Sequence, residues 1–293
     1  MLQPLLATAR QLLPNAVMPS PSAPPKPGKT ATPTQQPAEL GAAAHLAEVP
    51  DAAPERPGGE RAARIQRMFA DISHAYDLNN HLLSLNIDRA WRRSAVRMAL
   101  HQPVRPIVDV LDCCTGTGDL ALELAAKLPS EAQVIASDFV VPMLERAEEK
   151  RQRATGAPVS FLAGDTMNLP FPDESFDLAT VAFGIRNVAV PVDGLREMAR
   201  VLRPGGRLMV LEFTPLRNPV LRWTYHYYFT RVLPMVGGVI ARRLDAYRYL
   251  ARSVEVFPDC EEFKTLMEEA GLRNIAYRRL SMGIAAVHIG TRP

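Results

Sequence analysis

The order of apolar segments along residues 107–214 restricts the fold of this chain more than any other feature of its sequence. Short apolar runs with the composition of buried strands alternate there with amphipathic helical segments. Strands and helices that alternate in this way form a parallel sheet covered by helices on both faces. We therefore expect a doubly wound α/β fold with strands at 107–114, 133–138, 159–165, 176–183 and 207–214, and helices at 119–128, 142–153 and 191–202.

The C-terminal part of the chain departs from this alternation. The stretch DCEEFKTLMEEAG has helical spacing and ends at a glycine. The following stretch, LRNIAYRRLSMGIAAVHIGTRP, has the pattern of two strands joined by a short turn at 281–283. With the preceding strands, it predicts a seven-stranded, mostly parallel sheet that ends in an antiparallel hairpin. A plain dinucleotide-binding sheet does not require such a hairpin.

The N-terminal 59 residues differ in composition from the rest. They hold 12 of the 26 prolines, in stretches such as MPSPSAPPKPGKTATPTQQP. Such a segment cannot bury enough apolar surface to offset the entropy lost on ordering, so we expect a disordered tail over 1–59. The leading MLQPLLATARQLLPN lacks the arginine-rich character of an organelle-targeting peptide, which favours a plain tail. The folded domain is expected over 60–293, with a helical cap at 60–105.

Composition bears on several classes of partner. The net charge of +3 is too small to argue for or against binding of nucleic acid. No basic block is long enough to form a tail that binds nucleic acid, so we expect no nucleic-acid partner. The three cysteines are odd in number and have no CxxC spacing, which favours a reducing compartment without disulfides or a metal site. No apolar run reaches the ~18 residues that span a membrane, and we expect a cytoplasmic location.

A glycine loop follows the first predicted strand, within LDCCTGTGDL at 111–120. Gly116 and Gly118 allow positive φ and close approach of a ligand to the backbone. Asp138 closes the second strand, where a carboxylate can accept hydrogen bonds from a ribose diol. The pair Asp165-Thr166 ends the third strand and can meet an adenine edge. The three features together predict a cofactor that contains a nucleoside.

The glycines alone do not say which nucleoside is bound, because Gly116-x-Gly118-x-x-Ala121 also satisfies the loose dinucleotide pattern. Asp119 directly follows the second glycine, where a pyrophosphate would meet a second anion. A cationic sulfonium with an amino acid is better tolerated near acids such as Asp112 and Asp119. Cys113 and Cys114 end a buried strand, and we interpret them as small packing residues in preference to nucleophiles.

Six motifs occur in order along the chain: YDLNNHLLSLNIDRAWRR, LDCCTGTGDLALEL, FGIRNV, VLRPGGRLMVLEFTP, YRYLARSVEVFP and MGIAAVHIG. They resemble those of the ubiquinone/menaquinone biosynthesis C-methyltransferases, a family of class I S-adenosylmethionine-dependent enzymes, and the likeness runs from Met68 to Gly290. The second and fourth motifs are weakly specific, because they recur across class I methyltransferases. The resemblance implies a Rossmann-like fold, S-adenosylmethionine (SAM) as methyl donor and a polyprenylated demethyl-quinol as acceptor.

Carried over by position, the cofactor residues of that family fall on Thr117, Asp138, Asp165, Thr166 and Ala182. The family often has serine where this chain has Ala182, so this contact loses its hydroxyl and keeps only the backbone. The first loop residues, Cys-Cys-Thr, stand where an alanine-containing stretch is more usual.

Methyl transfer to a ring carbon requires alignment of donor and acceptor and stabilisation of a phenolate. We expect Arg186 to stabilise the oxyanion and Asn187 to orient the ring hydroxyls, since both follow the fourth strand. Asp119 has two interpretations, a general base and a helix-start carboxylate.

Two arginine-rich segments, 214–250 and DRAWRRSAVRMAL, either cover the acceptor and touch a membrane surface or are core helices with exposed arginines. For the segment 214–250 we also expect a role in covering the substrate. Aromatic candidates for the quinol pocket, which could equally serve in packing, are Tyr76, His81, Tyr247 and Tyr249.

Several functions stay open at this level. The acceptor is a naphthoquinol or a benzoquinol, because the motif meets ring positions that both share. Other readings are a methyltransferase for another small acceptor, a nicotinamide-dependent oxidoreductase, and a non-catalytic nucleoside-binding subunit. A homodimer is compatible with the sequence, which does not determine the oligomeric state.

Overall fold

The computed structural model describes residues 59–73, 86–215, 249 and 252–293. The predicted tail at 1–59 lies outside the described residues except for its last residue, and so does nearly all of the predicted covering segment at 214–250. Three of the four aromatic candidates for the quinol pocket, Tyr76, His81 and Tyr247, also lie outside them.

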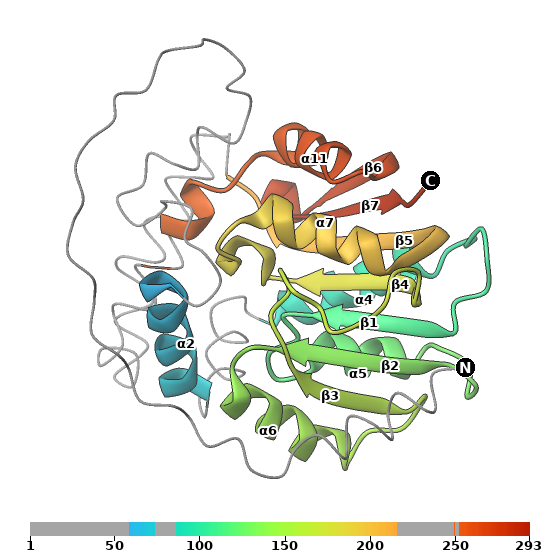
Figure 1. Ribbon diagram of the computed structural model, residues 1–293, viewed down its shortest axis with the longest axis horizontal. Helices are drawn as coiled ribbons and strands as arrows, with labels where there is room; N and C mark the ends of the chain where they lie inside the picture. The colour runs from blue at the N-terminus through green and yellow to red at the C-terminus, as the bar shows by residue number, and fades with distance from the viewer. Residues whose placement is uncertain (1–58, 74–85, 216–248, 250–251) are drawn as a thin grey trace, which may run out of the picture. The chain divides into compact units, whose positions relative to one another are not determined.

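In the described part of the chain, seven strands form a single sheet in the order β3-β2-β1-β4-β5-β7-β6 (Figure 1). Strands β1 to β5 are parallel to one another, whereas β7 is antiparallel to both β5 and β6. The predicted mostly parallel sheet with a C-terminal antiparallel hairpin is confirmed. The strands are β1 Asp109–Cys113, β2 Gln133–Asp138, β3 Val159–Ala163, β4 Phe176–Ala182, β5 Leu202–Phe213, β6 Arg273–Leu280 and β7 Ala285–Thr291.

Helices cover both faces of the sheet, each over its own apolar core. Helices α4 (Ile87–Ala99) and α5 (Asp119–Ala125) pack on one face, and α7 (Pro191–Val201) and α11 (Cys260–Glu269) on the other, in front of the sheet in Figure 1. The remaining helical elements are α2 Glu60–Ile72, α6 Val141–Arg151, η3 Ile185–Asn187 and η6 Ser281–Gly283.

Helix α4 shows how the sequence pattern places a helix. Trp91, Ala95 and Ala99 recur at helical spacing and are buried against the sheet, whereas Arg93 and Arg97 are exposed. The Trp91 indole also donates a hydrogen bond to Ser281 Oγ at 2.9 Å, which ties the helix to the turn between β6 and β7.

Several predicted boundaries move in the structure, among them those of the fifth and third strands. The fifth strand begins at Leu202, not at residue 207, because Leu202 already pairs with Phe176 of β4. The RPGG stretch therefore lies inside β5, where Gly205 has φ of 79° and the register with β4 shifts. The third strand ends at Ala163, and Asp165 instead forms an isolated bridge with Asn168.

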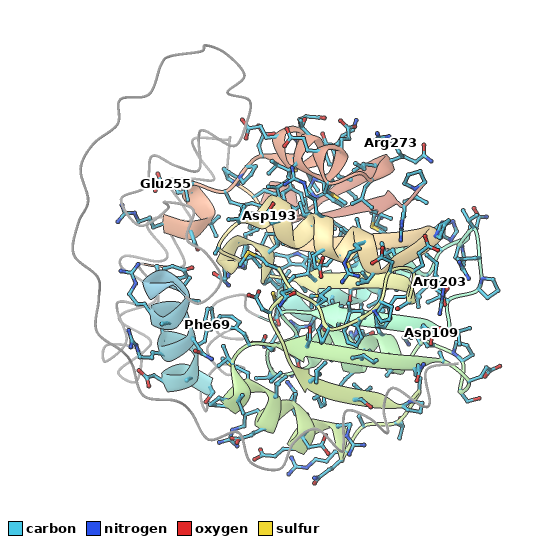
Figure 2. All side chains as sticks on the ribbon, viewed as in Figure 1. Phe69, Asp109, Asp193, Arg203, Glu255 and Arg273 are labelled. Carbon is cyan, nitrogen blue, oxygen red and sulfur yellow. The ribbon has the colours of Figure 1, made fainter. Side chains whose placement is uncertain are left out.

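Asp177 holds together the amino-terminal ends of the strands, at the edge where Figure 2 labels Asp109 and Arg203. Its Oδ2 accepts the backbone N–H groups of Val108 and Asp109 at 3.0 Å each, and its Oδ1 meets Arg203 Nη1 at 2.9 Å. Burial opposes ionisation of Asp177, but the two N–H donors and the arginine outweigh it and hold its pKa below the usual range.

We expect Asp177→Ala to lower the free energy of unfolding by about 2–4 kcal/mol, because it leaves two backbone donors without an acceptor and removes the carboxylate that Arg105 and Arg203 share. Urea denaturation measures this change. The matched control is Asp193→Ala, in an exposed pair with Arg196, where we expect less than about 0.5 kcal/mol. Equal effects of the two substitutions would contradict the role assigned to Asp177.

Candidate active site

A cavity of about 300 Å³ opens at the carboxyl ends of the parallel strands. Its walls come from the segments that follow β1, β2, β3 and β4, and from α2 and α4. Strand order reverses between β1 and β4, and in open α/β sheets ligands bind at such a switch point. All of the predicted site residues line this cavity except Gly118 and Arg186; those that do are Gly116, Thr117, Asp119, Asp138, Asp165, Thr166, Ala182 and Asn187.

The glycine loop makes a turn that few other residues allow. Gly116 and Gly118 have φ of 56° and 81°, in the left-handed region. A Cβ atom on Gly118 would also lie 3.0 Å from the Ala147 Cβ. Gly118 therefore shapes the loop between β1 and α5 without facing the cavity, and this close approach brings the loop against α6.

Asp138 lies at the end of β2 and meets the glycine loop. Its Oδ2 accepts the backbone N–H of Gly116 at 2.8 Å, and its Oδ1 accepts that of Val140 at 2.8 Å. Burial raises the pKa of Asp138 to about 6, against the effect of these donors. A carboxylate has about four lone-pair sites, so further acceptor capacity remains on the side that lines the cavity.

Asp112, at the end of β1, is a site residue that the sequence motifs did not single out beyond its being an acid beside the loop. Its side chain is fully buried, accepts hydrogen bonds from Thr115 at 2.6 Å and Thr180 at 2.7 Å, and lines the cavity. Burial raises its pKa to about 7. Its signal in the sequence is an acid directly before a glycine turn, inside an otherwise apolar strand.

The cavity lining is strongly acidic. Of the described residues that line it, four are aspartates and one, Arg92, is basic. A cationic ligand is attracted to such a lining, whereas a pyrophosphate is repelled by it. The four aspartates are Asp112, Asp119, Asp138 and Asp165.

Asp119 opens α5 between two cations. Its Oδ1 forms an ion pair with Lys150 of α6, and its Oδ2 lies 3.0 Å from Arg92 Nη2 of α4. The Lys150 ammonium also donates a hydrogen bond to the Thr117 hydroxyl at 3.0 Å. Because each carboxylate oxygen has a cationic partner, the contacts of Asp119 favour a positioning role over that of a proton acceptor.

Arg186 does not line the cavity, in contrast to the place that sequence reasoning gave it. Its Nη1 donates to Glu212 Oε1 and to the Phe183 carbonyl, both at 2.6 Å, and its side chain is 7% exposed. Glu212 is fully buried at the end of β5, and burial raises its pKa although Arg186 opposes the shift. The ion pair between Arg186 and Glu212 thus fixes the loop after β4 against the end of β5.

That loop presents Asn187 to the cavity. The hydroxyl of Tyr249 donates to Asn187 Oδ1 at 3.0 Å. The amide oxygen is therefore engaged by the tyrosine, which leaves the Nδ2 donors for a ligand. Tyr249 and Asn187, predicted separately for the acceptor pocket, are brought together by the fold across 62 residues of sequence.

Phe183 forms an aromatic wall of the cavity. It directly follows β4 and has φ of 56°, an uncommon conformation for a residue other than glycine. Its ring packs 4.6 Å from that of Phe213 and 6.1 Å from that of Trp91, centroid to centroid. The next residue must be small, because a Cβ on Gly184 would lie 2.3 Å from the Cys114 Cβ.

The cysteines have the packing role expected of them. Cys113 is fully buried in β1, and the Cys114 thiol lies 3.3 Å from the Thr166 hydroxyl at the cavity wall. Burial raises the pKa of both thiols, which keeps them neutral.

Helix α2 closes the side of the cavity beyond the strand ends, where Figure 2 labels Phe69. Gln66 donates from Nε2 to the Phe139 carbonyl at 2.8 Å, and both side chains line the cavity together with Phe69. The sequence predicted a helical cap in this region, but not that the helix contacts the segment after β2.

The chain is similar to proteins of one family. The sequence model of the ubiE/COQ5 methyltransferase family matches residues 59–292. A demethylmenaquinone methyltransferase from Thermus thermophilus is 48% identical over 77% of this chain and 100% of that protein. The demethylmenaquinone methyltransferase of Deinococcus radiodurans is 44% identical over 80% of this chain and 94% of that protein. A ubiquinone/menaquinone biosynthesis C-methyltransferase from Geotalea daltonii is 42% identical over 80% of this chain and 98% of that protein.

Solved structures share the fold. A SAM-dependent methyltransferase from Thermotoga maritima superimposes with a TM-score of 0.54 at 23% identity, over 78% of this chain and 100% of that chain. At this level of identity the likeness concerns the Rossmann-like methyltransferase fold alone.

We expect the buried Asp112 to make the ligand-free protein less stable as pH rises. Its folded pKa of about 7 lies above the ordinary 3.8, so the folded state binds more protons between these values and loses stability across them. The loss between pH 5 and 8 is roughly 2–3 kcal/mol. The variant Asp112→Asn lacks this loss. Urea denaturation should therefore find the variant more stable than the wild type at pH 8, with a smaller difference in the free energy of unfolding toward pH 5. Parallel curves for the two proteins would contradict this assignment.

Proposed function

The chain belongs to the ubiE/COQ5 methyltransferase family, and from this we propose that it transfers a methyl group from SAM to a ring carbon of a polyprenylated demethyl-quinol in quinone biosynthesis. Demethylmenaquinol is the first candidate acceptor, because the relatives from Thermus thermophilus and Deinococcus radiodurans are named for it. The benzoquinol of the ubiquinone pathway is the second, since other relatives carry both pathways in their names.

The acidic cavity is the observation that carries this proposal. SAM carries a sulfonium and an ammonium against a single carboxylate, so its net charge suits a lining of four aspartates and one arginine. A nicotinamide dinucleotide would place two phosphate charges against the same aspartates, which disfavours the oxidoreductase alternative. The ammonium has a partner in Asp112, whose buried carboxylate gains a counter-charge when the site is filled.

The nucleoside part fits the segments after β2 and β3. We assign the ribose diol to the free acceptor capacity of Asp138, and the adenine edge to Asp165 and Thr166. Gly116 and Thr117, in the glycine loop, lie beside the part of the cofactor that joins the ribose to the sulfur. Ala182 contributes its backbone, having no hydroxyl.

The acceptor ring fits the segment after β4. When bound, SAM supplies an electrophilic methyl group; the chain aligns the ring and excludes water. We assign Asn187 to a ring oxygen through its Nδ2 donors, and Phe183 to the ring face. Arg186 acts indirectly, by supporting this loop. Its ion pair with Glu212 lies outside the cavity wall, beyond the residues assigned to the phenolate.

The isoprenoid chain of the acceptor raises the question of a membrane. Within the described ranges, no helix has the length and apolarity to cross one. The apolar face of α4 is buried against the sheet, and the helix exposes arginines such as Arg93 and Arg97, with Ile87 at its start. We propose peripheral contact of these arginines with anionic head groups on the cytoplasmic side.

Arg186→Ala should lower turnover about 10- to 100-fold, because the loop that carries Asn187 loses its support. The dissociation constant of SAM should change less than about threefold, because no cofactor contact is removed. Steady-state kinetics and a SAM titration measure the two effects. The substitution also leaves Glu212 buried without a counter-charge. The double variant Arg186→Met/Glu212→Leu removes both charges and serves as the stability control; full turnover in that variant would exclude any need for Arg186.

The function is tested by transfer of a labelled methyl group from SAM to short-chain demethylmenaquinol and to the matching demethyl-benzoquinol. We expect label in the naphthoquinol at a higher kcat/KM than in the benzoquinol. A parallel titration with NADH should show no binding near the SAM affinity. Tight NADH binding without SAM binding would overturn the proposal, and SAM binding without transfer to either quinol would leave only the alternatives of another acceptor or a binding subunit.

A further inference from the structure

We propose that Arg92 binds the carboxylate of the methionine part of SAM, and that Asp88 and Asp119 position its guanidinium for this contact. The inference rests on the proposed function and deepens it, because it makes helix α4, which precedes the sheet in the chain, part of the cofactor site.

The first step is charge. A carboxylate entering this cavity meets four aspartates, so it needs a cation at the wall to be tolerated. Among the described lining residues, Arg92 alone supplies one. The charges of Arg186 and Lys150 lie elsewhere, since neither side chain is part of the cavity wall.

The second step is availability. The contacts of Arg92 with Asp88 at 2.7 Å and with Asp119 at 3.0 Å both use its Nη2. A guanidinium has five N–H donors in a fixed fork, so the donors on Nη1 and Nε are not used by these contacts, and either can meet a carboxylate oxygen. The side chain is 11% exposed, and that exposure is toward a cavity that it lines.

The third step is place. Asp119 directly follows the glycine loop, so its ion pair sets the Arg92 guanidinium beside that loop. The ribose and adenine are assigned to Asp138, Asp165 and Thr166 after β2 and β3. The amino acid end of the cofactor then extends past the loop toward α4, with Asp112 for its ammonium.

The fourth step is rigidity. Asp88 is 4% exposed and lies one turn before Arg92 on α4, while Asp119 belongs to α5 and is held from the other side by Lys150. Two carboxylates on different helices thus hold the arginine before any ligand arrives. A cation whose orientation is set in advance loses little entropy on binding.

The test is a binding titration of the full-length chain with SAM and with decarboxylated SAM, which lacks only the carboxylate. Arg92→Gln should weaken SAM binding by about 10- to 100-fold, the loss of a charge-assisted hydrogen bond. It should leave decarboxylated SAM within about threefold of wild type or bind it more tightly, because a positive charge is removed from the wall. The matched control, Arg153→Gln, changes an exposed arginine outside the cavity wall and should alter neither ligand.

Two results would overturn this inference alone: unchanged SAM binding in Arg92→Gln, and an equal loss for both ligands, which would mean a structural role. Binding of decarboxylated SAM also reports that the variant is folded. Absence of SAM binding by the wild-type chain would overturn the proposed function and this inference with it.

Discussion

Buried carboxylates at the carboxyl edge of the sheet are the constraint on which the site depends. Asp112 and Asp138 end adjacent parallel strands, and burial raises the pKa of each toward neutrality. Such groups cost the ligand-free fold stability, and a cationic ligand offsets that cost. The proposed preference for a sulfonium nucleoside and the lower stability expected of the ligand-free site therefore have the same physical origin.

The other charges near the cavity position these acids and the ligand more than they react. Asp119 joins α4, α5 and α6 through Arg92 and Lys150, and Glu212 holds Arg186 under the loop after β4. In both cases, a residue with a reactive role in the sequence interpretation has a partner that occupies its charge. Asn187, Phe183 and Arg92 line the cavity beside these acids.

The sheet divides stability and function between its two ends. At the amino end, Asp177 satisfies two backbone donors and pairs with Arg203, and its pKa is lowered. At the carboxyl end, Asp112 and Asp138 have raised pKa values, and their hydrogen-bond acceptor capacity is only partly used. The two ends use the same residue type, and the difference lies in how many donors surround each carboxylate.

Local spacing was enough to predict the strand and helix order and the antiparallel end of the sheet, because both depend on periodicity. Positions at strand ends were enough to predict several of the residues that line the cavity. Boundaries at Leu202 and Ala163 were missed, since pairing with a neighbouring strand decided them. The amino acid sequence by itself determined which side chains reach the carboxyl edge. Only the tertiary structure decided how they are partnered: Arg186 with Glu212, Asp119 with Arg92 and Lys150, and Asn187 with Tyr249. These partners lie 26 to 62 residues apart in the chain, and no local pattern records a contact that forms when separate elements pack.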